Sequence, residues 1–577
     1  MSYLEKYKEW CENPYFDTDT RNELLALKDN EEEIKDRFYL DLAFGTGGLR
    51  GVLGNGTNRM NIYTVRKATQ GLANYICKRA EQHKGVAIAY DSRLMSREFA
   101  EETALCFAAN DIKAYVFPSL RPTPELSFAV RRLGCVAGVV ITASHNPSNY
   151  NGYKVYWEDG AQITAPLDVE IISEANAITD YAVVKTIAKE EAVTKGLYEV
   201  IGSDIDDEYI AEMKKLVLNP EQLREYAKQI KVVYTPLHGT GLVPVTRILK
   251  EIGFEQVYVV PEQEQPDGRF PTVSYPNPED SKAFLMAIQL AKKVDADIIL
   301  ATDPDADRLG IYAKNTQTGE FVPFTGNMSG MIICEYILSQ RKKLNMIPED
   351  GALVTTIVSS NMALAVAKEY GLTCIETLTG FKYIGEQIKL FEQQKSYQYL
   401  FGFEESYGCL IGTYARDKDA VSAVMALCEA AAYYKAHNLT LWDQMLRIYD
   451  KYGYYMEDLH TITLCGQDGA ERINRIMDRF RTENVLSIAD IKVKALRDYE
   501  NDLVINYETL EKTATGLPKS NVLYFDLVDD VWCCVRPSGT EPKIKFYMGV
   551  KATSLEEGRV QLEKLKQAMS RFADETK

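Results

Sequence analysis

The 577-residue sequence contains no apolar run near the roughly 18 to 20 residues that a membrane-spanning helix requires. Its first twenty residues, MSYLEKYKEWCENPYFDTDT, lack the basic flank and apolar core of a secretory signal. We therefore expect a cytoplasmic protein that has no membrane partner.

Positive charge is also scarce. The chain has 66 Lys and Arg against 83 Asp and Glu, a formal net charge of −17. Because the surfaces of nucleic-acid binders are normally basic, this balance argues against nucleic acid as a partner. An anionic substrate would need a local positive pocket.

The sequence also has few features of thiolate metal sites or of hydrolases with a Ser-His-Asp triad. The 11 cysteines form no C-x-x-C pair and lie scattered in apolar runs, so we expect buried thiols. With five histidines and no G-x-S-x-G motif, a Ser-His-Asp arrangement has few candidates. No low-complexity linker divides the chain.

What the sequence does contain is a repeated alternation of strand and helix patterns. The segments KGVAIAYDSR, DIKAYVFPS and CVAGVVITAS are strand-like, and SREFAEETALCFAAN between the first two has helical spacing. The pattern recurs twice and changes after about Gly453. It predicts three related α/β units with mixed or parallel sheets and a smaller C-terminal α+β domain.

One polar loop stands out in the stretch VVITASHNPSNYNGYKVYW. Ser144 follows an apolar run, and His145 is adjacent, although neighbouring side chains on extended backbone point to opposite faces. Asn151-Gly152 is interpreted as a turn that folds the strand of Lys154 back toward the serine. A plain polar loop is the alternative.

A second stretch, IILATDPDADRLGIY, has three acids at alternate positions after an apolar strand: Asp303, Asp305 and Asp307. On extended backbone they would project on one side, where repulsion calls for a cation. Oxygen ligands favour Mg²⁺ over Mn²⁺ or Ca²⁺. An EF-hand fits poorly, because Arg308 and Lys314 occupy its glycine and glutamate positions. A solvated acidic turn remains open.

Two later loops suit a sugar phosphate. FGFEESYGCL offers acids and a hydroxyl between glycines, as vicinal sugar hydroxyls require, although an exposed turn would look the same. CVRPSGTEPKIKFY is not a Walker loop, but combines groups that can cradle phosphate. These groups are Arg536, Ser538, Gly539, Thr540, Lys543 and Lys545. A surface turn is equally compatible.

In their order along the chain, these four stretches resemble the α-D-phosphohexomutase superfamily over essentially the whole sequence. The matching motifs are T-A-S-H-N-P at Thr142–Pro147, D-x-D-x-D-R at Asp303–Arg308, G-E-x-S at Glu404 and Ser406, and R-x-S-G-T-E-P at Arg536–Pro542. Further similar pieces are GTGGLRG with Arg50, YDSR with Arg93, NGYK with Lys154, PDGRFP, and ETLTGFKY with Gly380 and Lys382.

The resemblance implies four domains around a central cleft, each giving one loop. The expected domains are residues 1–203 with a helical N-terminal extension and the phosphoserine loop, 204–324 with the metal loop, 325–452 with the sugar loop, and 453–577 with the phosphate loop. A monomer and a dimer are both compatible with it.

The resemblance also implies a mechanism. Ser144 would carry a phosphoryl group, and one Mg²⁺ would be held by Asp303, Asp305, Asp307 and Ser144. Glucose 1,6-bisphosphate would be the intermediate and activator. The implied catalytic residues are Ser144, Lys154, Arg50, Arg308 and His145, with Lys154 for proton transfer and phosphate positioning. Sugar binding falls to Glu404, Ser406, Lys382 and Gly380, and phosphate binding to Arg536, Ser538, Gly539, Thr540 and Lys545.

One loop narrows the range of candidate sugar substrates. Glu-Glu-Ser-Tyr is closer to the form in glucose-preferring mutases than to the Met-Ser-Gly-His form of dual-specificity enzymes. We therefore expect interconversion of glucose 1-phosphate and glucose 6-phosphate, with mannose or pentose phosphates as alternatives. A metal-dependent phosphatase is the alternative from another class, but its D-x-D-x-T/V form is broken at Asp307.

Overall fold

The computed structural model describes residues 1–43, 47–464, 466–538 and 543–576. Gly539 and Thr540, which we expect to bind phosphate, lie outside the described residues. The chain divides into two compact units, each described below by itself. Unit 1 comprises residues 1–325, 381–395 and 407–440, and unit 2 comprises 326–380, 396–406 and 441–577.

Unit 1 begins with three short helices, in the stretch where we expect a helical extension. They are α1 Tyr3–Glu12, α2 Thr18–Ala26 and α3 Glu31–Phe38. Ser2, Asp17 and Asn30 cap them with side-chain oxygens. Their core is aromatic, and Trp10 stacks on Phe16 with ring centroids 4.2 Å apart.

The first sheet has six strands in the order β1-β5-β4-β2-β3-β6. β4, β2, β3 and β6 run parallel, and β5 runs antiparallel to both β4 and β1. The strands are β1 Gly48–Val52, β2 Val86–Tyr90, β3 Ala114–Val116, β4 Ala137–Ile141, β5 Tyr150–Trp157 and β6 Tyr198–Val200. The accompanying helices are α4 Ile62–Lys78, η1 Gln82–Lys84, α5 Ser96–Ala109, α6 Thr123–Leu133, α7 Leu167–Asn176, η2 Tyr181–Val183 and α8 Lys189–Thr194.

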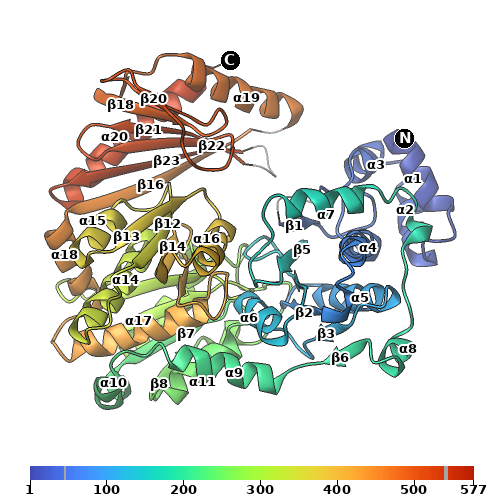
Figure 1. The fold of residues 1–577 in the computed structure, drawn as a ribbon, viewed down its shortest axis with the longest axis horizontal. Helices are drawn as coiled ribbons and strands as arrows, with labels where there is room; N and C mark the ends of the chain where they lie inside the picture. The colour runs from blue at the N-terminus through green and yellow to red at the C-terminus, as the bar shows by residue number, and fades with distance from the viewer. Residues whose placement is uncertain (44–46, 465, 539–542, 577) are drawn as a thin grey trace. The chain divides into compact units, whose positions relative to one another are not determined.

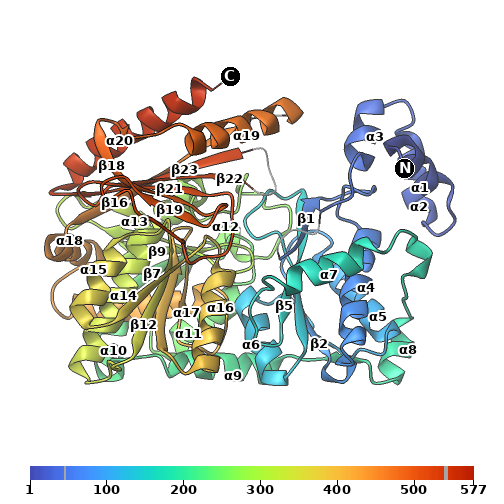
Figure 2. The ribbon, with the colours of Figure 1, turned by 45° about the horizontal axis from the view of Figure 1, so that its top comes forward.

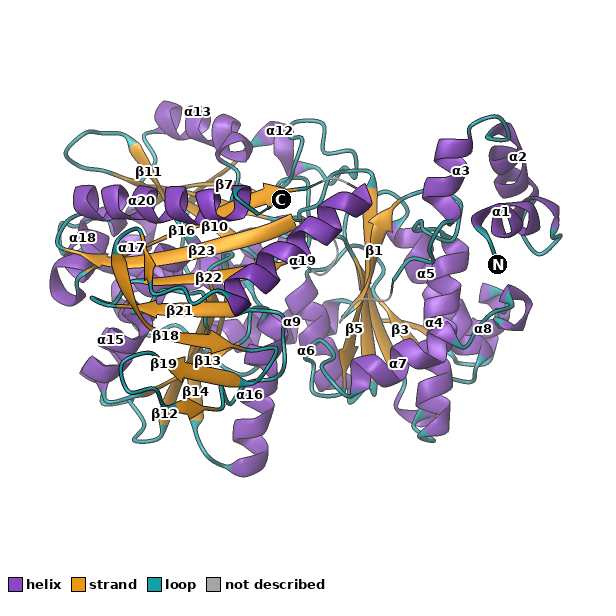
Figure 3. Cartoon of the chain, turned by 90° about the horizontal axis from the view of Figure 1, so that it is seen from above, coloured by secondary structure: helices purple, strands orange, loops and turns teal. Residues whose placement is uncertain are grey.

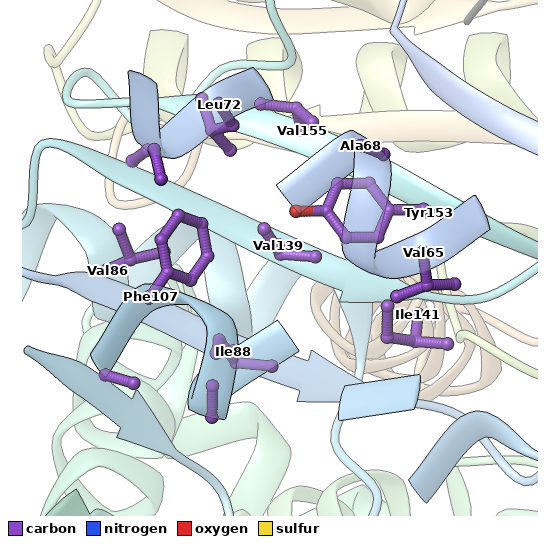
Figure 4. Packing of buried hydrophobic residues seen from close by; sticks show 14 of the residues in the cluster. Val65, Ala68, Leu72, Val86, Ile88, Phe107, Val139, Ile141, Tyr153 and Val155 are labelled. Carbon is purple, nitrogen blue, oxygen red and sulfur yellow. The ribbon is translucent and has the colours of Figure 1, made fainter. Parts of the chain in front are cut away.

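Alternate residues of β4 face opposite layers of this sheet. Val139 packs into the cluster formed with α4 and α5 (Figure 4). A Cβ built on the neighbouring Gly138 would lie 2.4 Å from Val130 of α6. The sheet is therefore covered by helices on both faces, as Figure 3 shows.

The second sheet of unit 1 repeats this design. Its order is β11-β10-β9-β7-β8, with β9, β7 and β8 parallel and β10 antiparallel to β9. The strands are β7 Lys231–Thr235, β8 Gln256–Val259, β9 Ile298–Thr302, β10 Leu309–Lys314 and β11 Phe321–Phe324. The helices of this part are α9 Ser203–Lys214, α10 Pro220–Tyr226, η3 Ala227–Gln229, α11 Leu242–Glu251, α12 Pro261–Glu264, η4 Ser281–Phe284 and α13 Leu285–Val294.

In both sheets one loop leaves the carboxyl end of a parallel strand and returns on an antiparallel one. Ser144 lies in the loop from β4 to β5, and the three aspartates lie in the loop from β9 to β10. Ligands of α/β sheets bind at carboxyl ends of strands, so this placement favours a site there. The remaining elements of unit 1 are α16 Phe381–Gln394, β15 Gly408–Ile411 and α17 Ala420–Lys435.

Unit 2 contains a parallel set of strands in the order β13-β12-β14. These are β12 Gly351–Thr356, β13 Thr373–Thr377 and β14 Gln398–Glu404, and the helices are α14 Gly326–Lys343, α15 Met362–Tyr370 and α18 Leu441–Tyr452. β14 ends at Glu404, so the predicted sugar loop also begins at the carboxyl end of a parallel strand.

The last part of unit 2 has a sheet of a different kind, ordered β16-β23-β22-β21-β18-β19-β20 and antiparallel throughout these pairings, with β17 against β18. Its strands are β16 Tyr454–Thr463, β17 Ser487–Ile488, β18 Ile491–Asp498, β19 Leu503–Asn506, β20 Lys512–Thr513, β21 Leu523–Leu527, β22 Trp532–Pro537 and β23 Lys543–Ala552. Two helices, α19 Gly466–Thr482 and α20 Leu555–Asp574, share its core (Figure 2). This confirms the change to α+β expected after about Gly453.

Among the described residues, no helix has the length and hydropathy to cross a membrane. The ten described cysteines form no disulfide, and eight of them are buried, as the sequence indicated.

Candidate active site

Ser144 is held against an aspartate from the other sheet of unit 1. Its hydroxyl Oγ donates to Asp303 Oδ2 at 2.7 Å, across 159 residues of sequence. Its backbone N–H donates to Thr142 Oγ1 at 2.8 Å. Ser144 is 5% exposed and has a φ of 52°, a left-handed conformation that is costly for a residue with a side chain.

This conformation changes the predicted position of His145. We expected its side chain to point away from Ser144, but His145 Nδ1 lies 3.2 Å from Ser144 Oγ. The prediction assumed extended backbone and was wrong because φ of Ser144 is positive. Burial and the nearby charges of Arg308 and Arg50 hold the pKa of His145 well below its ordinary value, so the imidazole is neutral.

Arg93 ties the serine loop together from inside. Its guanidinium, fully buried, donates to the backbone carbonyls of Ser144 at 2.6 Å, Pro147 at 2.8 Å and Tyr150 at 3.0 Å, and also to that of Asn146. These bonds cross the whole reversal between β4 and β5. The family resemblance included the segment YDSR, but it did not predict that Arg93 would hold the serine loop.

Two residues from different parts of unit 1 support Arg93. Asp91 lies 3.4 Å from its Nε, and the ring of Phe270 lies 5.0 Å from the guanidinium carbon. Phe270 belongs to the PDGRFP segment, which the sequence singled out without a role. Arg93 thereby connects the serine loop with the part of unit 1 that contains the acid loop.

The acid loop is compact. One oxygen from each of Asp303, Asp305 and Asp307 can be chosen so that all three lie within 4.8 Å of one another, and each residue is at most 2% exposed. We expected extended backbone here, but residues 304–306 form a turn, and Ala306 has a φ of 50°. The predicted convergence is found, whereas the reason given for it was wrong.

Three buried carboxylates ionise unequally. Burial, together with repulsion from the other two acids, raises the pKa of Asp303 well above its ordinary value. Burial opposes the ionisation of Asp305 too, but the Lys154 ammonium brings its pKa below the ordinary range. Asp307 is also shifted down, because Lys418, Lys154 and Arg308 outweigh burial and the charge of Asp305.

The donor set fits a hard divalent cation. Among the described residues, Asp305 Oδ1 and Asp307 Oδ1 are buried without a hydrogen-bond donor. Such oxygens are costly to leave unsatisfied, and carboxylate oxygens are the ligands that Mg²⁺ prefers. An acidic group that can hold a metal ion is therefore present beside Ser144.

Lys154 lies on β5 and reaches this group. Its Nζ is 2.8 Å from Asp305 Oδ2 and 3.4 Å from Asp307 Oδ2. Burial opposes its charge, but these two carboxylates raise the pKa of Lys154 above its ordinary value. The interpretation of Asn151-Gly152 as a turn was wrong, since both residues lie within β5 and the chain reverses before Tyr150.

A further cation beside the acid loop is Lys418, which the sequence analysis did not identify. It follows the charged run Arg416-Asp417 ahead of α17, and its Nζ lies 3.2 Å from Asp307 Oδ2. Asp417 holds Lys418 at 3.1 Å and accepts from Tyr156 at 2.6 Å. Such a run beside a buried helix was the only signal available in the sequence.

The two predicted arginines have different surroundings. Arg308 donates its backbone N–H to Asp303 Oδ1 at 3.0 Å, while its guanidinium pairs with Glu279 at 2.7 Å. Arg50 is exposed on β1, and its guanidinium donates to Asn146 Oδ1 at 3.2 Å. Both therefore belong to the region that contains the serine and acid loops.

The predicted sugar residues fall in both units and are described separately. In unit 1, Lys382 lies 4.0 Å from Asp168, and burial lowers its pKa. In unit 2, Glu404 is 5% exposed at the end of β14, and Gly380 has a φ of 114°, which glycine accepts readily. Ser406 is half-buried.

The predicted phosphate residues lie on adjacent strands of unit 2. Arg536 of β22 is paired in register with Lys545 of β23, and Ser538 N–H donates to Lys543 O at 2.7 Å. The charge of Lys545 also acts on Glu405, which accepts from Thr356 Oγ1 at 3.0 Å. The sugar and phosphate loops of unit 2 therefore share an electrostatic environment.

Glu405 predicts a pH dependence of stability. Burial and then the charge of Glu404 raise its pKa from 4.5 to about 7. The folded chain thus binds more protons than the unfolded chain in this range, so the stabilisation is complete below about pH 4.5 and is lost as pH rises through about 7.

Glu405→Gln should therefore flatten the fall in thermal midpoint across that interval. The matched control, Glu511→Gln, changes an exposed glutamate and should reproduce the wild-type profile. Equal slopes for wild type and Glu405→Gln would show that Glu405 does not titrate in this range.

Comparison with known proteins gives consistent results. Family models described as phosphoglucomutase/phosphomannomutase α/β/α domains I, II and III match residues 41–182, 207–318 and 325–452. A protein named phosphoglucomutase from Staphylococcus epidermidis is 37% identical over 523 residues, covering 90% of this chain and 92% of the relative. Another of that name, from Staphylococcus saprophyticus, is 35% identical over 97% of this chain and 98% of the relative.

Solved structures share the fold. The parafusin (phosphoglucomutase) of Paramecium has a TM-score of 0.67 at 19% identity, covering 93% of this chain and 96% of that one. A phosphoglucomutase/phosphomannomutase family protein from Burkholderia thailandensis has a TM-score of 0.63 at 18% identity, covering 92% and 97%. Three α/β/α domains and a C-terminal domain thus account for the architecture.

Proposed function

Because the chain belongs to the phosphoglucomutase/phosphomannomutase family, we propose that it is an isomerase that interconverts glucose 1-phosphate and glucose 6-phosphate. One observation carries the proposal: a buried serine hydroxyl lies 2.7 Å from one member of an acidic group that can hold a metal. The name phosphoglucomutase borne by the relatives supports glucose as the sugar.

Ser144 is the phosphoryl carrier in this proposal. A hydroxyl oxygen of the hexose monophosphate bonds to the phosphorus as the bond from phosphorus to Ser144 Oγ breaks. The substrate hydroxyl loses one proton and Ser144 Oγ gains one, so the step balances and yields glucose 1,6-bisphosphate. After the bisphosphate turns around, Ser144 takes its other phosphoryl group and the isomeric monophosphate leaves.

Asp303, Asp305 and Asp307, with Ser144, would hold one Mg²⁺. When bound, this ion supplies positive charge that offsets the charge of the transferring phosphoryl group. Lys154 supports the same end as a nearby cation, with its Nζ 2.8 Å from Asp305 Oδ2 and 3.4 Å from Asp307 Oδ2. It would position the phosphoryl group and take part in proton transfer. Neutral His145 positions the Ser144 hydroxyl.

The remaining assignments follow the family motifs. Domains of residues 1–203, 204–324, 325–452 and 453–577 would contribute one loop each. Glu404, Ser406, Gly380 and Lys382 would bind the sugar, and Arg536, Ser538, Gly539, Thr540 and Lys545 its phosphate. Arg50 and Arg308 would face the transferring group, and the enzyme would work in the cytoplasm.

Substrate preference tests the choice of sugar. We expect kcat/KM for glucose 1-phosphate to exceed that for mannose 1-phosphate and ribose 1-phosphate by at least about tenfold, a difference that a few pocket contacts can supply. Rates with all three substrates at saturating Mg²⁺ and glucose 1,6-bisphosphate give the comparison. A preference for either of the other sugars contradicts the assignment, and phosphate release without isomerisation would indicate a phosphatase.

Arg93 should affect catalysis only by holding the Ser144 loop in position. Arg93→Ala removes the hydrogen bonds that hold the Ser144 loop, and a displacement of about 1 Å of a reacting group costs about 10²-fold in rate. We expect a loss of that size in kcat with a smaller change in KM, and partial rescue by added guanidinium ion.

The control for this test is Arg97→Ala, which removes an exposed arginine from α5. It should leave kcat unchanged with and without guanidinium. An Arg93→Ala enzyme with wild-type kcat would exclude the positioning role.

A further inference from the structure

A cavity of about 330 Å³ lies in unit 1, and part of its lining comes from α6, α9 and α11. Helix α9 packs against both α6 and α11, and Figure 1 shows where the three helices lie. None of the residues that line it belongs to the site described above. Its size falls within the range of about 300 to 1,000 Å³ usual for small-molecule pockets.

The walls are mainly apolar. Leu120, Ile210, Leu242 and Val243 contribute much of the lining. Val243 is 68% exposed at the start of α11, so the cavity has a rim that solvent reaches. Apolar walls favour a ligand with an apolar body.

Two buried oxygens in this lining have no hydrogen-bond partner within the described residues. They are Glu125 Oε1 and Thr240 Oγ1, and each residue is 2% exposed. An unsatisfied buried oxygen costs about 1 to 3 kcal/mol. Both oxygens therefore remain available to a hydrogen-bond donor on a molecule that enters the cavity.

The charges around the cavity are already balanced. Arg121 makes two hydrogen bonds to Asp206, at 2.8 and 2.9 Å. Arg247 pairs with Asp207 at 2.6 Å and with Glu251 at 2.8 Å. Burial, with a hydrogen bond to Asp206, raises the pKa of Glu125 well above its ordinary value, so this acid is neutral. Arg121 Nε also lies 3.8 Å from Glu125 Oε1, which is too far for a hydrogen bond. Because the charged side chains named here already have partners among the described residues, the lining suits a neutral ligand better than an ion.

We propose that this cavity binds a neutral, mostly apolar small molecule that carries an N–H or O–H donor for Glu125 Oε1, and that its occupation is coupled to the acid loop.

The coupling follows from hydrogen bonds that join the cavity walls to that loop. Thr240 N–H donates to Pro304 O at 2.8 Å. Thr123, which starts α6 two residues before Glu125, donates its N–H to Asp305 O at 2.9 Å and its hydroxyl to Asp305 Oδ2 at 3.0 Å.

The segment of Gly239 and Thr240 packs tightly against the acid loop. A Cβ built on Gly239 would lie 2.4 Å from Pro304 Cα, so the two backbones are in direct contact. A ligand that steadies Glu125 and Thr240 should therefore steady the aspartates and tighten Mg²⁺ binding. By linkage, Mg²⁺ must tighten ligand binding by the same factor.

Indole is a suitable probe, because it is neutral and apolar and has one N–H donor. We expect calorimetry to show indole binding and a crystal soak to place its N–H at Glu125 Oε1. 1-Methylindole, which has lost the donor, should bind about tenfold more weakly, since the Glu125 oxygen is then left unsatisfied. Equal binding of the two probes, or no density in this cavity, would overturn the proposal.

A matched pair of variants tests the acceptor. Glu125→Gln keeps an acceptor oxygen of the same shape and should bind indole like wild type. Glu125→Met removes it and should abolish the preference for indole over 1-methylindole. Since Glu125→Met could unfold, Val243→Trp gives a second test: it changes only an exposed rim residue and should block the cavity. Unaltered indole binding by Val243→Trp would place the probe elsewhere and refute the site.

Mg²⁺ titrations by calorimetry, with and without saturating indole, test the coupling without an activity assay. We expect indole to lower the Kd for Mg²⁺ severalfold in wild type and to have no effect in Val243→Trp. An identical Kd for Mg²⁺ in wild type with and without indole would disprove the coupling.

Discussion

Ser144→Ala should lose at least about 10⁴-fold in kcat/KM for the interconversion of glucose 1-phosphate and glucose 6-phosphate, because the phosphoryl carrier itself is removed. Three observations support the proposal of that role for Ser144. Its side chain is buried, its hydroxyl donates to Asp303, and its backbone is held in a left-handed conformation. A residue kept in such a conformation by its surroundings is a frequent feature of active sites.

The measurement is a coupled assay with glucose 1,6-bisphosphate supplied, together with intact-protein mass. Ser148→Ala is the matched control, since Ser148 is in the same loop and only partly buried. It should keep both its activity and its bound phosphate. Near-wild-type turnover by Ser144→Ala would mean that the phosphoryl group is carried elsewhere.

Asp303→Asn should abolish the response of the protein to Mg²⁺. Asp303 is the one of the three acids whose pKa is raised, by burial and then by its two acidic neighbours, so an amide resembles its protonated form. The amide oxygen can still accept from the backbone N–H groups of Asp307 and Arg308. We therefore expect a folded variant that is as stable as wild type when no divalent cation is present.

Its Mg²⁺-dependent behaviour should differ sharply. Changes to residues that only hold a metal ligand in place already cost up to about 10²-fold in metal affinity, and removal of a ligand should cost at least as much. The concentration of Mg²⁺ needed for half-maximal activity should rise accordingly, and Mg²⁺ should no longer raise the thermal midpoint.

The control is Asp295→Asn, at an exposed position with a φ of 55° that asparagine tolerates well. It should keep the wild-type Mg²⁺ response. A wild-type response from Asp303→Asn would mean that this carboxylate does not bind the ion.

The sequence predicted the helices and strands well, but it did not predict the backbone conformation of the functional loops. Alternating patterns identified α5, α13 and α15 with the strands around them, because buried apolar residues recur at the period of each element. Ser144 and Ala306, however, take positive φ values without being glycine. Such conformations persist where the surrounding structure holds them, as the Arg93 hydrogen bonds hold the Ser144 loop, and no local pattern reveals them.

The candidate active site was predicted mainly from the resemblance to a known family, and much less from the chemistry of the residues. Nothing in the residues alone joins Ser144 to Asp303, whose contact spans 159 positions. Lys418 and Thr123 went unnoticed because a single lysine in a charged run, or a threonine before a proline, is common in any chain. Their importance is visible only once Asp305 and Asp307 are placed beside them.

The most direct test of phosphoryl storage on Ser144 is a rapid-quench experiment. The protein is loaded with phosphate from labelled glucose 1,6-bisphosphate in Mg²⁺, then mixed with glucose 1-phosphate, quenched and mapped by peptide mass spectrometry. We predict one labelled peptide, modified at Ser144, that loses its label at least as fast as the enzyme turns over. Label on another residue, or loss slower than turnover, would contradict the account.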